Sequence, residues 1–188
     1  MKLRAVAGIV LGLVMVGCSA DYVTDSQATV LLVVTSINSG SPLMSDVRGD
    51  TGQIINCQSD VALTSILKNP QSPVVDTEKV VLQRYDVSYV RSDGRAVEGV
   101  DVPYRFSAPM TATLGPTDEL TVAIDVVRQQ AKLEPPLSSI TGLQIVEMTA
   151  NVTFYGETVS RQSVSASGAA SIRFADWAPG TPTCESGS

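Results

Sequence analysis

Serine, aspartate, glutamate and lysine are the side chains of this sequence that could do acid–base or nucleophilic chemistry, because its 188 residues include no histidine. That absence removes the commonest general base, the commonest metal ligand and the usual near-neutral pH switch. Serines are abundant, but an activated serine needs a base, and no local motif joins a serine to Lys68, Lys79 or Lys132. Most hydrolase and metalloenzyme functions are therefore excluded, and we expect the protein not to be an enzyme.

Two overlapping tripeptides invite a chemical interpretation. Asp50-Thr51-Gly52 matches the Asp-Thr-Gly of aspartic proteases, in which two carboxylates share a proton and activate water. In that family an apolar strand leads into the aspartate, whereas the polar run 45–49 precedes it here. Arg48-Gly49-Asp50 spells the integrin-binding tripeptide, which in an arbitrary loop is nearly always coincidence. A turn is the favoured interpretation of both.

A calcium site is a further hypothesis. The carboxylates of Asp93, Glu98, Asp101, Asp118 and Glu119 could gather at one end of a domain and bind the cation through oxygen. Their spacing does not match an EF-hand loop, and solvated turn carboxylates that keep an acidic protein soluble are the favoured alternative. We therefore assign no metal site and no cofactor.

A row of aromatic residues suggests a sugar-binding face. Tyr85, Val87 and Tyr89 share one face of an expected strand, and Tyr104 and Phe106 lie nearby in the sequence. Stacked aromatic rings on an open face could hold sugars, although such a row more often packs in a core or across strands. Binding of a glycan or another small ligand is kept as the alternative function, with its contact residues unassigned.

The first eighteen residues carry the most specific signal. Lys2 and Arg4 precede twelve small or apolar residues, 5–16, as in a secretory signal peptide. Twelve residues in a helix would span only about 18 Å, short of the roughly 30 Å hydrocarbon core of a bilayer. The run 15–18 resembles the lipobox of bacterial lipoproteins, which implies cleavage between Gly17 and Cys18 and acylation of the Cys18 thiol. An ordinary cleaved signal with a chance cysteine is the alternative.

The net charge and the expected lipid anchor both bear on how the protein is held at a membrane. Without Lys2 and Arg4 the chain keeps 11 basic residues against 19 acidic ones, a net charge of −8. Such a surface disfavours nucleic acid and is repelled by anionic headgroups, so acyl chains on Cys18 must hold the protein at the membrane. By resemblance to enterobacterial sorting, Ser19 after the cysteine implies the outer membrane, with the periplasmic or surface face left open.

Cysteine arithmetic predicts one disulfide bond. Once Cys18 is acylated, Cys57 and Cys184 remain, an even pair in an exported protein. Joining them would close a loop of more than a hundred residues, for which chain entropy gives about 4 to 5 kcal/mol as an upper figure. Two free thiols are the alternative.

Apolar residues mostly recur at every second position, which predicts half-buried strands. The pattern is clearest in 120–126 and 146–154, where a helix would place threonines on its apolar face. A change of phase between Leu82 and Tyr85 predicts a β-bulge near Gln83 and Arg84. The other expected strands are 29–37, 60–67, 80–91, 104–106, 110–114, 159–167 and 171–174. Of these, the run 60–67 also fits one face of a helix.

Turn residues separate these strands. The runs 92–94, 115–118 and 155–157 favour antiparallel hairpins, while 69–73 and 133–136 contain prolines and are expected to cross between sheets. About seven to nine such strands predict an all-β fold, an immunoglobulin-like or fibronectin III-like antiparallel β-sandwich. We expect a signal peptide at 1–17, a lipidated tether at 18–27, one domain at 28–183 and a flexible tail at 184–188.

Four segments carry a resemblance to a known family; they are 89–95, 99–104, 128–137 and 152–156. They resemble bacterial lipoproteins that have one immunoglobulin-like domain behind a lipobox, over about the last two thirds of the mature chain. The resemblance implies that fold and location, and no activity or catalytic residues. We therefore expect a structural or protein-interaction module that contacts an envelope protein through a sheet edge or a loop end.

Overall fold

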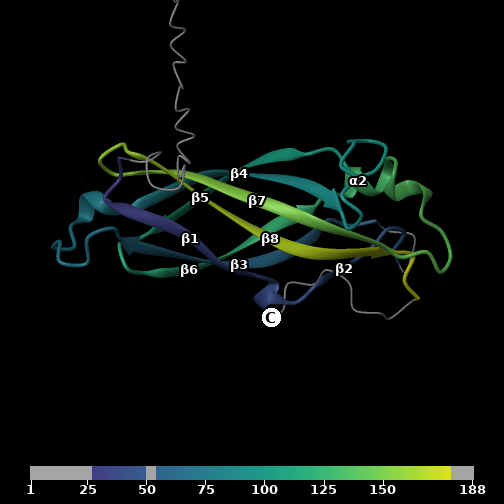
Figure 1. Ribbon diagram of the computed structural model, residues 1–188, viewed down its shortest axis with the longest axis horizontal. Coiled ribbons are helices and arrows are strands. Elements are labelled where there is room, and N and C mark those ends of the chain that lie inside the picture. The colour runs from purple at the N-terminus through teal and green to yellow at the C-terminus, as the bar shows by residue number, and fades with distance from the viewer. Residues whose placement is uncertain (1–26, 50–53, 179–188) are drawn as a thin grey trace, which may run out of the picture.

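The computed structural model describes residues 27–49 and 54–178, and these residues are mostly β-strand (Figure 1). A three-stranded sheet has the order β1 (Val30–Ile37), β3 (Cys57–Leu67), β6 (Glu119–Val127). A five-stranded sheet has the order β2 (Leu43–Asp46), β8 (Ser163–Ala175), β7 (Val146–Thr158), β4 (Val80–Arg91), β5 (Phe106–Leu114). Short helical turns connect them: η1 (Asn38–Gly40), η2 (Asp76–Glu78), α2 (Gln129–Leu133) and η3 (Leu137–Ser139). The all-β prediction is confirmed.

The core lies between the two sheets and follows from the period-two pattern. Along β7 every second residue is buried, from Val146 to Thr158, and the intervening residues are exposed or half-buried. The largest side chains that are almost fully buried include Phe154, Phe174 and Leu63, from strands of both sheets. Burying such side chains stabilises the fold by about 1.5 to 3 kcal/mol each.

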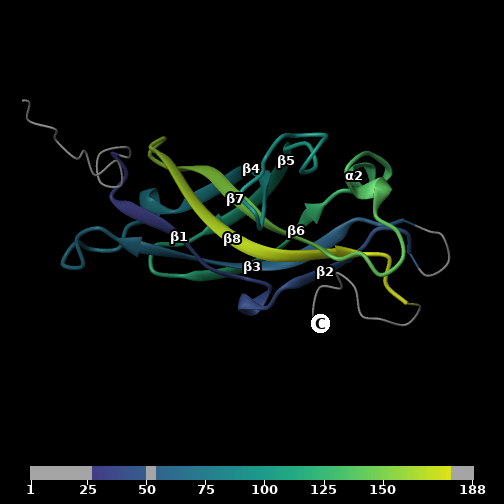
Figure 2. The same cartoon turned by 45° about the vertical axis from the view of Figure 1, so that its right-hand side comes forward.

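The first two strands, β1 and β2, follow each other closely in the sequence but belong to different sheets. β1 pairs antiparallel with β3, and β2 then pairs parallel with β8, Leu43 opposite Ile172. Between them the backbone takes positive φ angles at Asn38, Ser39 and Gly40, 51°, 52° and 80°, which turn the chain from one sheet to the other. The strands before and after this turn run in the same direction beside β8 in both views (Figures 1 and 2).

Several local predictions are confirmed. The pairing of β4 shifts by one residue between Leu82 and Arg84 against both of its neighbours, so the bulge lies where the phase change predicts it. The run 60–67 is a strand, not a helix. The proline-rich runs 69–73 and 133–136 connect strands of different sheets, as expected.

Other local predictions are wrong. β2 was not expected, and because it pairs parallel with β8 the fold is not purely antiparallel. The runs 159–167 and 171–174 are not separate strands: β8 is one strand that begins at Ser163. The run 115–118 crosses between sheets, and 104–106 is loop up to Phe106. The run 92–94 begins the long loop that joins β4 to its antiparallel neighbour β5, so the hairpin predicted there is confirmed.

The run 155–157 is not a turn, because it lies inside β7. A Cβ on Gly156 would come 2.6 Å from the carbonyl oxygen of Val81, so this glycine allows two strands to approach closely. The turn comes later, where the N–H of Thr158 donates to the carbonyl of Gln162 at 2.9 Å and Arg161 has a φ of 63°.

Most of the predicted anchoring and bonding sites lie outside the described residues. These are Gly17 and Cys18, the tripeptide Asp50-Thr51-Gly52, and Cys184. Cys57 is fully buried at the start of β3, and its pairing with Cys184 stays a prediction. Within the described part of the chain, no helix has the length and apolar character needed to span a bilayer.

Candidate functional site

The aromatic row on β4 belongs to the core, as such rows more often do, and it does not form the open face that was considered for sugar binding. Tyr85, Val87 and Tyr89 are 5%, 0% and 4% exposed. The Tyr85 ring packs edge-on against Phe106, with ring centroids 6.3 Å apart. Tyr104 is exposed, on the loop before β5. The inward face of β4 therefore offers no platform for a ligand.

Both tyrosine hydroxyls on this strand bind the backbone of β6 in the opposite sheet. The Tyr85 hydroxyl accepts a hydrogen bond of 3.1 Å from the amide of Asp125, and the Tyr89 hydroxyl donates one of 2.7 Å to the carbonyl of Val126. Burial raises the pKa of both phenols, because an ionised phenolate would lose its hydration there. These residues join the two sheets.

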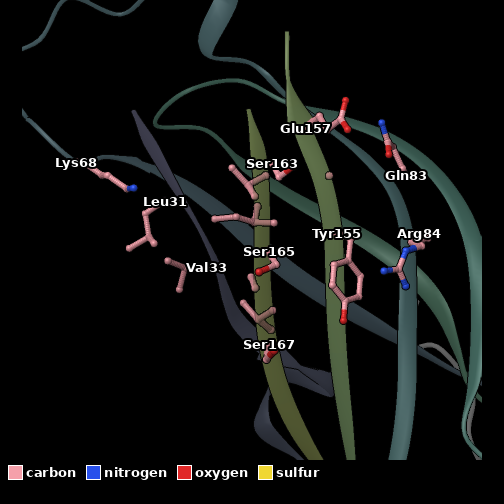
Figure 3. Close-up of a pocket in the computed structure, with 15 residues that line it drawn as sticks. Leu31, Val33, Lys68, Gln83, Arg84, Tyr155, Glu157, Ser163, Ser165 and Ser167 are labelled. Atoms are coloured by element: carbon pink, nitrogen blue, oxygen red, sulfur yellow. The ribbon is translucent and has the colours of Figure 1, made fainter. Parts of the chain in front are cut away.

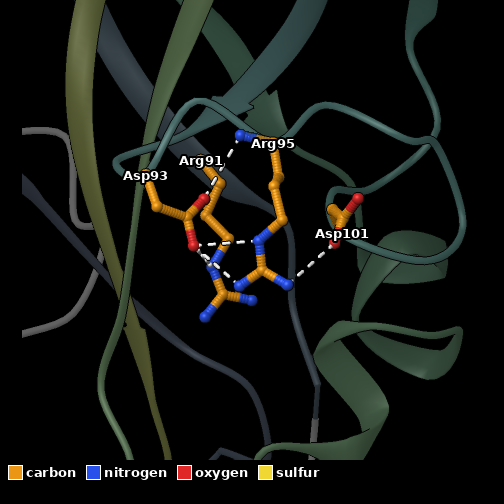
Figure 4. Close-up of polar contacts among 4 residues, drawn as sticks. All are labelled: Arg91, Asp93, Arg95 and Asp101. Carbon is orange, nitrogen blue, oxygen red and sulfur yellow. Dashed lines mark hydrogen bonds and ion pairs between the residues drawn. The ribbon is translucent and has the colours of Figure 1, made fainter.

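The acidic residues proposed for calcium are paired with arginines (Figure 4). The Asp93 carboxylate accepts bonds of 2.9 and 2.7 Å from the Arg95 guanidinium and lies 3.3 Å from Arg91. Asp101 lies 3.4 Å from Arg95. The hydrogen bond from Arg95 holds the pKa of Asp93 below its ordinary value. The cluster is a set of ion pairs that fixes the β4–β5 loop.

The other proposed ligands do not join that cluster. Glu98 pairs with Arg105 at 2.7 Å, in the same loop. Asp118 immediately precedes β6 and Glu119 is its first residue, opposite Thr64 of β3, whereas Asp93 lies two residues after the end of β4. Among the described residues no three or more potential metal-ligating side chains gather.

Lys132, which sequence reasoning considered as a base, is buried on α2 with 3% of its surface exposed. Burial lowers the pKa of its amine to about 8, and the negative charge of Asp46 opposes that shift. The Asp46 carboxylate is itself held by the amide of Arg48 at 2.9 Å. The buried lysine therefore lies within electrostatic range of Asp46, the last residue of β2.

The candidate site is an open groove of about 770 Å³ between β1 and β8 (Figure 3). We call it the β1–β8 groove. Residues 31–34 of β1 form one wall and 163–167 of β8 form the other. It extends over the outer surface of β7 and β4, where Tyr155 and Arg84 lie side by side.

At Ser165 and Ser167 the wall formed by β8 presents backbone groups that pair with no described strand. In an antiparallel pair, the backbone groups of successive residues point alternately toward and away from the neighbouring strand. The amide of Thr158 donates to the carbonyl of Gln162, so the backbone groups of even-numbered residues of β8 bond to β7 and those of odd-numbered residues point away from it. The carbonyl of Ala175, an odd-numbered residue, accepts a hydrogen bond from the amide of Val47. This agrees with the assignment, because β2 pairs with the edge of β8 that points away from β7. β2 reaches only residues 172–175, and no other described strand pairs with the outer edge of Ser165 and Ser167.

The wall formed by β1 presents a matching edge. The amide of Lys68 donates to the carbonyl of Thr29 at 2.9 Å, so odd-numbered residues of β1 bond to β3. The amides and carbonyls of Leu32 and Val34 then face away from β3, and β1 is the outermost strand of its sheet in the described structure. Two open strand edges therefore border one groove.

Side chains at the groove mouth are mixed in character. The Arg84 guanidinium lies 3.7 Å from the centre of the Tyr155 ring and 2.6 Å from the Asp86 carboxylate. The hydrogen bond to Asp86 raises the pKa of Arg84, which stays charged in any case. The hydroxyls of Thr153 and Ser167 bond to each other at 2.9 Å.

Sequence reasoning missed this groove. The run from Ser163 to Ser167 shows serine at every second position, which predicts a strand with a polar outer face, but periodicity does not tell which edge of a strand is left unpaired. The edge of β8 is left unpaired at Ser165 and Ser167 in the described structure because β1 pairs with β3, and only β2, which follows β1, pairs with β8.

Comparison with models of known protein families gives no match, and comparison with curated protein sequences gives none either. The site is therefore interpreted from its geometry.

Proposed function

We propose that the protein is a lipid-anchored module of the bacterial cell envelope that binds a partner protein in the β1–β8 groove. The observation that carries this proposal is the meeting of two open strand edges, at Leu32 and Val34 on β1 and at Ser165 and Ser167 on β8. Open edges pair readily with another polypeptide, and folded proteins usually cover or blunt them. The role is binding and not catalysis.

We further propose that the fold is immunoglobulin-like, as in the lipoprotein family that the sequence resembles. In that fold the first, second and fifth strands share one sheet, and the third, sixth and seventh share the other. The order β1-β3-β6 opposite β8-β7-β4-β5, with β2 continuing the first strand into the second sheet, supports this assignment. The buried tryptophan of antibody domains has no counterpart on β4, because the single Trp177 follows β8.

The lipobox supports the membrane location. Acylation of Cys18 would tether the domain to the outer membrane through the short polar run 19–27, leaving the groove accessible to envelope proteins.

Binding of a glycan in the same groove is the alternative. The exposed hydroxyls of Ser165 and Ser167 beside Tyr155 could bond to a sugar, although Arg84 already covers one face of the Tyr155 ring. The glycan would use side chains, whereas a protein partner would use the edges.

Site-specific photo-cross-linking in intact cells tests the proposed function. A photoreactive residue at Val33, in the groove, should give a discrete cross-linked partner. The same residue at Thr111, exposed on β5 at the far edge of the five-stranded sheet, is the matched control and should not. Equal cross-linking from both positions, or none from Val33, would contradict the proposal.

A further inference from the structure

We infer that the occupant of the β1–β8 groove is an extended segment of a partner polypeptide, which enters between β1 and β8 as an added strand antiparallel to both. This inference rests on the proposed interaction function and specifies how the partner is recognised. Backbone hydrogen bonds supply the affinity in such strand addition, and alternate side chains supply the specificity.

The hydrogen-bonding groups needed for this mode are in place on both walls. Ser165 presents its amide and carbonyl on the side of β8 away from β7, and Leu32 presents its own on the side of β1 away from β3. Ser167 and Val34 face the same way, next to the point where the two strands touch at Gly168. A single inserted strand has two edges of its own, so it can bond to β8 with one and to β1 with the other. A sugar has no regular row of donors and acceptors with this spacing.

The direction of the added strand follows from the topology. β1 continues through η1 into β2, which is parallel to β8, and both β1 and β8 run from left to right in Figure 1 and in Figure 2. A strand between them is therefore antiparallel to both or parallel to both. Antiparallel pairing is slightly more stable per residue, so we assign that direction.

The length of the added strand is limited by Gly168. A Cβ on this glycine would lie 2.6 Å from Cγ1 of Val34, so β1 and β8 come into close contact there and the groove ends. From that point to the open end, the walls span residues 31–34 and 163–167. The groove thus holds about five residues of extended chain, roughly 17 Å.

The floor of the groove selects small side chains. Leu32, Val164 and Ala166 line the groove and are only 3%, 5% and 9% exposed without any occupant. The core is therefore already closed, and inward-pointing side chains of the added strand must be glycine, alanine or serine. Outward-pointing side chains would contact Leu31 and Val33, which favours apolar residues at alternate positions.

A library of random nine-residue peptides displayed on phage is the probe. Selection on the folded, lipid-free domain should recover peptides in which small and larger apolar residues alternate. N-methylation of one recovered peptide at each position in turn should weaken binding at every position across five residues, because one phase bonds to β8 and the other to β1. Weakening at alternate positions only would indicate pairing with one edge and would overturn the insertion.

Two variants of one residue separate backbone from side-chain recognition. Ser165→Pro removes an amide that faces the groove and leaves the β7–β8 ladder intact, so it should raise the Kd of a selected peptide at least tenfold, a loss of about 1.4 kcal/mol. Ser165→Ala removes only the hydroxyl and should change the Kd less than twofold. Equal losses in both variants, or recovery of no peptide, would overturn the inference. Circular dichroism and thermal melting verify that each variant folds, and the N-methylated peptides test the same bonds on the unaltered protein.

The cross-linking experiment distinguishes the two levels of the proposal. If the photoreactive residue at Val33 still captures its partner in the Ser165→Pro variant, the groove binds the partner in another way. That result would support the proposed function and overturn the inference of strand addition. If sedimentation shows that the domain self-associates through this groove and that Ser165→Pro abolishes the association, the occupant is a second copy and the inference of a separate partner is overturned.

Discussion

The hydroxyl of Tyr89 on β4 donates a hydrogen bond of 2.7 Å to the backbone carbonyl of Val126 on β6, and so joins the two sheets through the core. Tyr89 is 4% exposed, and the Val126 side chain is fully buried. A buried carbonyl without its donor costs about 1 to 3 kcal/mol. The tyrosine therefore fixes how the three-stranded sheet, which carries β1, sits against the five-stranded sheet, which carries β8.

Tyr89→Phe should lower the free energy of unfolding by about 1 to 3 kcal/mol, because it keeps the ring and removes the donor. Urea unfolding followed by circular dichroism measures the change. Tyr104→Phe is the matched control, since Tyr104 is 57% exposed, and it should leave the unfolding midpoint unchanged. A Tyr89→Phe variant as stable as the parent would show that this bond does not contribute.

The folding stability should rise with pH above about 8 because of Lys132. Its pKa is lowered by burial from 10.5 to about 8 in the folded protein. Between these values the unfolded chain binds a proton that the folded chain does not, so raising the pH favours folding, by at most about 3 kcal/mol. Lys132→Met should abolish this rise in urea titrations across that range, while Lys79→Met, at a half-exposed side chain, should retain it.

Above pH 10, Tyr89 should lower the folding stability as the pH rises, which is opposite to the effect of Lys132. Burial raises the pKa of its phenol above the ordinary 10.0, so above pH 10 the unfolded chain releases a proton that the folded chain keeps. The stability then falls with rising pH. In Tyr89→Phe this fall should be smaller, which the same titrations test, and an unchanged slope would count against it.

The sequence predicted those parts of the fold that local pattern controls. In β7 and β4 every second side chain faces the core, so the apolar alternation and even the bulge at Gln83 are visible in the residues. The four-residue β2 has no such pattern, because it is held by pairing with β8. Gly156 looks like a turn residue, although its role is to let Val81 approach, which only the packed structure reveals.

The candidate site was less predictable than the fold. The tyrosines of β4 are typical of an exposed binding face as much as of a core, and only the position of β6 above them decides. The β1–β8 groove depends on where strands end and which edges stay unpaired. Such information comes from contacts between residues far apart in the chain, and the types of those residues do not encode it locally.

Cys18→Ala should release the protein from membranes, because acyl chains on the Cys18 thiol are the expected anchor. The measurement is carbonate extraction of membranes followed by immunodetection. Ser19→Ala, which leaves the cysteine in place, is the matched control and should remain membrane-bound. A Cys18→Ala protein that still sediments with the outer membrane would contradict the lipoprotein hypothesis.

Cys57 and Cys184 should be joined in the exported protein. Mass mapping without reductant should find their two peptides linked, and labelling of both thiols after denaturation without reductant would exclude the bond. The double variant Cys57→Ala/Cys184→Ala should lose about 2 to 5 kcal/mol of stability, the usual range for removing a native disulfide from a small secreted domain. If the single variant Cys184→Ala exposes one labelled thiol at position 57, the pairing is supported independently of stability.

Gly168→Ala should disturb the closed end of the groove. The new Cβ would lie 2.6 Å from Cγ1 of Val34 and 3.1 Å from its Cβ, so β1 must move away from β8. Overpacking of this kind costs about 1 to 3 kcal/mol, measured by urea unfolding. Val34→Ala removes the contacting methyl groups, so the double variant should lose less than the sum of the two single losses. Ala169→Ser, at an exposed neighbour, is the control and should be neutral. Additive losses in the double variant would show that the strands do not meet at this glycine.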